Sequence, residues 1–158
     1  MELIKLIKML FTPIKDVNEL NLIGMKHFPF KGYKYMMWCG NIIYRGNETP
    51  IISEESLTHE TIHLMQAKVK GSWIKYYWSY FIQWMKGNPI IHPASSAYYT
   101  IPYEMEAYAN QHNKEYIDNY HGQFLHCYVI KDRKKTYKLK GGTPRTWKVY
   151  LKTIKLEL

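Results

Sequence analysis

Cysteine is scarce in this chain: only Cys39 and Cys127 occur among its 158 residues. They form no CxxC pair and no regular pairing pattern, so we expect neither a disulfide framework nor a zinc site built from thiolates. Such sparing use of cysteine is typical of a reducing compartment, and the sequence therefore favours a cytoplasmic protein.

A secretory leader and a membrane-spanning helix are also missing from the sequence pattern. Lys5 and Lys8 interrupt the apolar residues near the start, and no cleavage site of small residues follows them. The most apolar segment, residues 72–86, would rise only about 22 Å as a helix, which is less than the roughly 30 Å of hydrocarbon in a bilayer. We therefore expect no segment of this chain to cross a membrane.

The first 14 residues predict an amphipathic basic helix. Its apolar residues recur at helical spacing opposite Lys5 and Lys8, so they share one face. This face can pack onto the domain or lie against a membrane surface, and both interpretations stay open. The apolar face consists of Leu3, Leu6, Ile7 and Leu10.

Acidic residues are few, at 13 against 22 Lys and Arg, which leaves a formal charge of +9 concentrated towards both ends of the chain. This charge would attract phosphates, anionic lipids or acidic proteins, although solubility alone also accounts for it. No clear nucleic-acid motif accompanies it. Apolar residues make up 46% of the chain, enough for a folded core, so we expect one domain over residues 1–158.

The predicted fold class is α+β, a small and mostly helical domain with a β-hairpin or sheet near its N-terminus. Residues 32–45 contain two aromatic and β-branched runs separated at Gly40 and Asn41, which predicts a hairpin. Ser53 is a good N-cap and Gly71 a good C-terminal stop, so they predict a central helix between them. This helix carries the HETIH stretch of residues 59–63.

Further helices are predicted after the central one. Residues 72–86 lie between two glycines and are apolar around most of a helical circumference. The prolines of residues 88–100 indicate a loop, and Pro102 suits the first turn of a helix that reaches about Tyr120. We expect the recognisable core to span about residues 50–120, and the pattern of the basic tail, residues 122–158, predicts no definite structure.

The HETIH stretch has the HExxH spacing of the zincins. His59 and His63 are four residues apart and share one helix face, so both imidazoles can bind one Zn²⁺ ion. Glu60 flanks the same opening and would act as the general base towards a zinc-activated water. A metzincin would need glycine and histidine where this chain has Gln66 and Val69, so we expect a carboxylate as the third ligand.

Glu104 is the leading candidate for this third ligand. It lies in the segment PYEMEAYANQ, where Ala107, one turn further on, would let the two helices approach closely. Glu106 is the alternative ligand, or else an acceptor that orients an imidazole N–H group. Both glutamates also fit solvated acids near a helix N-terminus, and the sequence leaves these interpretations open.

The stretch HETIHLMQ, followed by an aromatic helix and AYYTIPYEMEAYANQ, resembles a group of small bacterial zincin-like proteins of the gluzincin type (HExxH…ExxA). The resemblance covers roughly residues 57–120, with Tyr103 in place of a phenylalanine. It implies a zincin-like fold, zinc held by His59, His63 and Glu104, and Glu60 as the catalytic carboxylate. The matching positions of the second segment are Tyr98, Ile101, Tyr103, Glu104, Glu106, Ala107, Tyr108 and Asn110.

Three functions follow from these features. The leading hypothesis is a zinc metallopeptidase acting on peptides or proteins, with Glu60 activating the water. The second is a zinc-stabilised binding module without turnover, which would need a fourth protein ligand such as His92 or His112. The third is a binder of membrane surfaces or other anionic partners. An oxyanion donor for the first hypothesis stays unassigned among His92, Tyr98, Tyr99 and His112.

Overall fold

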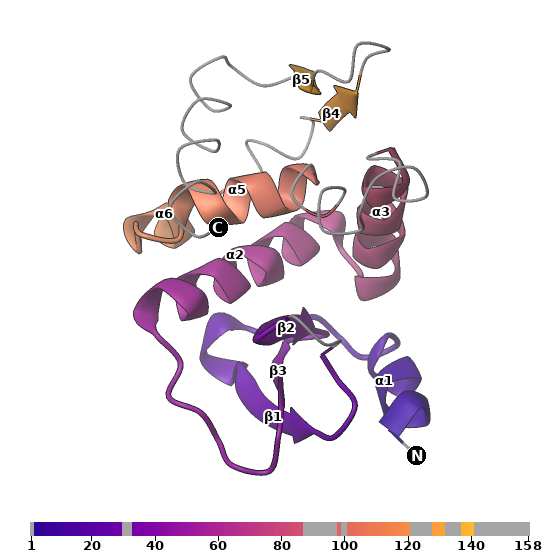
Figure 1. Ribbon diagram of the computed structural model, residues 1–158, viewed down its shortest axis with the longest axis vertical. Coiled ribbons are helices and arrows are strands. Elements are labelled where there is room, and N and C mark those ends of the chain that lie inside the picture. Colours follow the sequence, from indigo (N-terminus) through magenta and orange to yellow (C-terminus); the bar gives the residue numbers. More distant parts are fainter. Residues whose placement is uncertain are drawn as a thin grey trace.

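The computed structural model describes residues 2–29, 33–86, 98 and 101–120, together with the backbone of 128–131 and 137–140. The chain is α+β: a small three-stranded sheet lies on one side of a long central helix, and further helices lie on the other. Figure 1 shows this arrangement, with helix α2 between the sheet and helix α5.

The N-terminal sheet consists of β1 (Asn21–Met25), β2 (Tyr35–Trp38) and β3 (Asn41–Arg45), in the order β1-β3-β2. The predicted hairpin is confirmed as the antiparallel pair β2–β3. Its turn is formed by Cys39 and Gly40, which both have positive φ values of 50° and 72°, so Asn41 already belongs to β3. β1 pairs with β3 in parallel and was not predicted.

Helix α2 (Glu54–Lys70) has the ends that its sequence predicts. The Ser53 side chain accepts a hydrogen bond from the backbone N–H of Ser56, and Gly71 adopts a left-handed conformation at φ 77°. The helix contacts β2 on one side and α3 and α5 on the other. Its middle, from Thr58 to Leu64, is buried, so the HETIH residues face the protein interior.

The prediction of one continuous helix from Pro102 to about Tyr120 is wrong in the middle of this segment. The structure instead has α5 (Pro102–Asn110) and a short α6 (Glu115–Asp118). The side chain of Asn113 accepts a hydrogen bond from the backbone N–H of Glu115 at 3.1 Å, and this bond starts a new turn. Asparagine competes with the helical backbone in this way, and here the competition divides the helix.

The predicted helix of residues 72–86 is confirmed as α3 (Trp73–Lys86), and the N-terminal one as α1 (Glu2–Met9). α1 is held by the buried Leu6 and by a hydrogen bond from Trp38 Nε1 to the Leu6 carbonyl oxygen, so it packs onto the sheet. In the described part of the chain, no helix is long and apolar enough to cross a membrane.

The main core lies where α2, α3, α5 and the hairpin meet. Its fully buried members include Ile42, Leu64, Trp73, Tyr76 and Tyr103. The predicted loop at residues 88–100 lies outside the described residues except for Tyr98. Most of the basic tail also lies outside them, although β4 (Tyr128–Lys131) and β5 (Tyr137–Lys140) form an antiparallel pair within it.

Candidate metal site

Two histidines on α2 point into the interior on the same face. His59 and His63 are 8% and 5% exposed, and their Nε2 atoms lie 3.1 Å apart. The rings meet edge to face at a centroid distance of 4.8 Å. One helical turn therefore presents two imidazole nitrogens to the same point in space.

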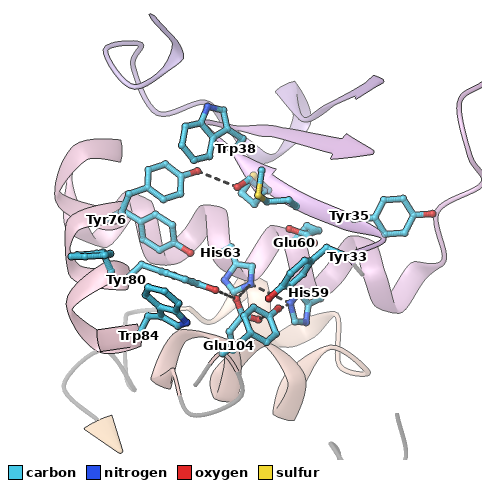
Figure 2. Close-up of a pocket in the computed structure, with 15 residues that line it drawn as sticks. Tyr33, Tyr35, Trp38, His59, Glu60, His63, Tyr76, Tyr80, Trp84 and Glu104 are labelled. Carbon is cyan, nitrogen blue, oxygen red and sulfur yellow. Dashed lines mark hydrogen bonds and ion pairs between the residues drawn. The ribbon is translucent and has the colours of Figure 1, made fainter. Parts of the chain in front are cut away.

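Helix α5 adds a carboxylate to this point. Glu104 is 2% exposed, and its Oε2 lies 3.3 Å from Nε2 of His59 while its Oε1 lies 3.3 Å from Nε2 of His63. Ala107, which follows one turn later, is fully buried where α5 packs against α2. Figure 2 shows the three side chains facing one another.

The spacing of these atoms suits a tetrahedral zinc ion. Zn–N and Zn–O distances of about 2.0–2.1 Å and tetrahedral angles place ligand atoms about 3.3 Å apart. The separations among the ligand atoms of His59, His63 and Glu104 are 3.1–3.3 Å. In the described part of the chain, these three residues form the group that could hold a metal ion.

The electrostatics of the group also suit a cation. Burial opposes the charge of Glu104, but the two histidines outweigh it and hold the pKa of this carboxyl well below its usual range. Burial likewise lowers the pKa of His63, but the charge of Glu104 and the hydrogen bond to it prevail and raise that pKa to about 9. Without a metal, Glu104 therefore stays negatively charged and His63 holds a proton, which a bound metal ion would have to displace.

Each imidazole is oriented by a glutamine. Nδ1 of His63 donates to Oε1 of Gln66 at 2.8 Å, and Nδ1 of His59 donates to Oε1 of Gln111 at 3.2 Å. The Gln66 amide is fixed because its Nε2 donates to the Tyr103 carbonyl oxygen and to Glu106. With the proton on Nδ1, each Nε2 presents a lone pair to a metal.

Glu106 does not join the histidines and Glu104. Its carboxylate accepts hydrogen bonds from Gln66 at 2.9 Å, from Tyr116 at 2.6 Å and from Tyr120 at 3.3 Å. Burial raises its pKa, while these hydrogen bonds favour the charged form. The geometry therefore places Glu106 behind Gln66, where it supports the orientation of His63 rather than acting as a third ligand.

Two tyrosines complete the surroundings of Glu104. Tyr80 of α3 donates to its Oε1 at 2.7 Å, and Tyr98 donates to its Oε2 at 2.6 Å. Tyr98 was among the sequence candidates for an oxyanion donor and lies at the site. His112 does not: its side chain is half exposed and pairs with Glu55. His92 and Tyr99 lie outside the described residues.

Glu60 lies beside the three residues and is 7% exposed. Burial raises its pKa, and the neighbouring histidines act in the opposite direction. Among the described residues, its buried Oε2 has no hydrogen-bond partner. Leaving a buried carboxylate oxygen unpaired is costly, and this one lies beside the cluster of His59, His63 and Glu104.

A cavity of about 600 Å³ opens beside these residues. His59, Glu60, His63 and Glu104 lie along one part of it, and the remaining lining is aromatic or methionine. Two of the lining tyrosine hydroxyls already have acceptors within the protein: Tyr77 donates to the Met37 carbonyl oxygen and Tyr80 to Glu104. The other lining residues are Tyr33, Tyr35, Met36, Trp38, Tyr76, Phe81, Trp84 and Tyr98.

Comparisons with protein-family models, curated proteins and solved structures gave no match to this chain. The interpretation of the site therefore rests on its geometry and chemistry.

Sequence reasoning did not assign a role to Gln66, Gln111 or Tyr80. Gln66 lies three residues after His63 on the same helix face, so the spacing could have indicated its contact with the imidazole. Tyr80 reaches the site from α3 and Gln111 from the end of α5, and no local sequence pattern indicates such long-range contacts.

Proposed function

We propose that this protein is a zinc-dependent metallopeptidase in which His59, His63 and Glu104 hold the metal and Glu60 is the general base. The observation that carries the proposal is the unpartnered Oε2 of Glu60, buried at the edge of a cavity next to three metal-suited side chains. Zinc bound there would supply a Lewis acid and lower the pKa of a bound water to about 7.

Glu60 would transfer the proton in this reaction, first as general base and then as general acid. As the water oxygen attacks the peptide carbonyl carbon, Glu60 would accept a water proton and then deliver it to the amide nitrogen as the C–N bond breaks. Tyr80 and Tyr98, which donate to Glu104, are the candidate hydroxyl donors for a developing oxyanion.

A purely structural zinc site would have a different donor set. Structural zinc is almost always held by four protein ligands, whereas catalytic zinc has three and a fourth position for water or substrate. Within the described residues the cluster has three members, and His112 pairs with Glu55 instead. This donor set supports catalysis over the zinc-stabilised binding module.

The cavity indicates the class of substrate. Apart from the four site residues it is lined by aromatic rings and methionines, and several tyrosine hydroxyls are already bonded within the protein. A charged substrate side chain would be desolvated there without a partner. We therefore propose peptides with a bulky apolar or aromatic side chain beside the cleaved bond.

The test combines metal analysis with cleavage of a peptide library. In zinc-loaded wild type we expect cleavage next to apolar residues, and in Glu60→Gln a loss of about 10²- to 10⁴-fold with the zinc content unchanged. Glu104→Ala should lose both zinc and activity. Glu55→Gln, an exposed acid on the same helix, is the matched control and should resemble wild type.

Two results would overturn this proposal. Full activity in Glu60→Gln would remove the general base, and an unchanged zinc affinity in Glu104→Ala would remove the third ligand. A zinc-binding wild type that cleaves no peptide of the library would refute peptidase activity while leaving the metal site intact.

A further inference from the structure

Helix α3 exposes an apolar stripe to solvent. Trp78 is 65% exposed, the most of the five side chains in the stripe, and the others are between 37% and 48% exposed. Their spacing of three or four residues places them on one face, over a length of about 16 Å. The α3 stripe is formed by Ile74, Trp78, Phe81, Ile82 and Met85.

The uncharged polar residues Ser79 and Gln83 of this helix are turned inwards instead. Ser79 Oγ forms a hydrogen bond of 2.8 Å with the hydroxyl of Tyr103, a fully buried residue of α5. Gln83 Nε2 in turn donates to Ser79 Oγ. A helix on a water-facing surface normally shows the reverse arrangement, with polar residues outside. The α3 stripe is therefore a surface that needs a partner.

The Asp, Glu, Lys and Arg residues in this part of the sequence are all lysines. The chain has no Asp or Glu from residue 61 to residue 103, whereas Lys70 and Lys75 lie in this stretch. Lys75 is exposed and immediately follows Ile74. A partner that covers the stripe should therefore combine an apolar surface with negative charge.

Helix α1 repeats this combination nearby. Leu3 and Ile7 are 63% and 48% exposed, and Lys5 and Lys8 lie between and beside them. Trp38 links α1 to α3: its Nε1 donates to the Leu6 carbonyl oxygen, and its ring stacks on Tyr77 at 4.6 Å. Both helices lie at the right-hand side of the view in Figure 1.

We propose that the α3 stripe, with α1 beside it, binds the surface of an anionic lipid bilayer. Tryptophan, phenylalanine and aliphatic side chains would enter the headgroup boundary, and the lysines would bind anionic headgroups. Two copies of this chain packed through the stripe would bring Lys75 towards the lysines of the other copy, so the charge disfavours self-association. Phe81 belongs both to the stripe and to the cavity lining, so the cavity would open next to the lipid.

Vesicle flotation tests this proposal with the full chain. Vesicles of phosphatidylcholine with phosphatidylglycerol should bind wild type, and Trp78→Ser/Ile82→Ser should bind at least tenfold more weakly. Neither of these residues lines the cavity. The matched control is Ile51→Ser/Val69→Ser, which removes two exposed apolar side chains outside α3 and should bind like wild type.

Vesicle binding at high salt distinguishes the apolar contacts of the α3 stripe from electrostatic attraction by the basic tail. In about 1 M NaCl, where the screening length is roughly 3 Å, wild type should stay partly bound through its apolar contacts and the α3 double variant should be released. Equal binding of these two proteins would overturn the proposal, as would a wild type that leaves anionic vesicles unbound and instead forms dimers through α3. Glu104→Ala should bind vesicles like wild type, which keeps this test independent of the proposed zinc chemistry.

Discussion

Gln66 holds His63 in the orientation that a metal ligand needs. Its Oε1 accepts the Nδ1–H of His63 at 2.8 Å, so Nε2 of the ring faces His59 and Glu104. The glutamine is itself completely buried and is fixed through its amide nitrogen, which donates to Glu106 at 2.9 Å. A single side chain thus connects the candidate ligand to a second buried carboxylate.

Gln66→Ala should therefore weaken zinc binding by about 10- to 100-fold, because partners that orient ligating histidines have effects of that size. Competition with a chromogenic chelator would measure the affinity. Gln83→Ala, which removes a glutamine from α3 away from the histidines, is the control and should leave the affinity unchanged. An affinity equal to wild type in Gln66→Ala would show that the Gln66–His63 contact has no part in metal binding.

Zinc should stabilise the fold, since it would offset the charge of the buried carboxylates of Glu60 and Glu104. At a zinc concentration of about 1,000 times Kd, linkage gives about 4 kcal/mol. For a domain of this size we expect a rise in Tm of about 10 °C, measured by thermal unfolding in zinc and in chelator. His59→Ala/His63→Ala should show no shift, and the same shift in this variant would place the bound zinc elsewhere.

The sequence predicts the parts of this molecule that local chemistry determines. Ser53 and Gly71 specify the ends of α2 through their own conformations, and the spacing of His59 and His63 follows from the helical repeat. Glu104 could be singled out because Ala107 allows close helix packing. Each of these predictions depends on residues within one or two turns of each other.

Other features depend on contacts between distant residues. β1 (NLIGM) lacks a clear alternation of apolar and polar residues and is a strand because it pairs in parallel with β3. The orientation of α3 depends on tertiary contacts such as the burial of Trp73 and the bond between Ser79 and Tyr103, which the pattern of α3 alone does not include. The roles of Gln111 and Tyr80 at the site depend on tertiary packing in the same way.

Gly71→Ala should destabilise the protein by about 1 kcal/mol. The residue has φ 77°, and a side chain in the left-handed region is strained even though no atom lies within 4 Å of an added Cβ. Gly71→Asn should lose clearly less, because asparagine tolerates this conformation better. Urea unfolding would compare the two variants, and equal stability of Gly71→Ala and wild type would contradict a left-handed cap.

Cys39 should be a protected thiol whose contribution to stability declines in alkali. It is fully buried, and burial raises the pKa of its thiol from the ordinary value of 9.0 to about 12, although a hydrogen bond with Tyr77 acts in the opposite direction. The pKa of this thiol is higher in the folded state than in the unfolded state, so its contribution to stability is fully present below about pH 9. The unfolded chain gains thiolate between about pH 9 and 12, so this contribution is lost there.

The experiment uses Cys127→Ser as background, which leaves Cys39 as the remaining thiol of the chain. At pH 8 alkylation of the folded protein should be at least 100-fold slower than in denaturant, because the thiol is both buried and protonated. The free energy of unfolding should fall more steeply above pH 9 than in Cys39→Ala, in which the other alkaline groups still titrate. Parallel pH profiles of the two proteins, or rapid alkylation of the folded one, would place Cys39 in a more exposed position than the hairpin turn gives it.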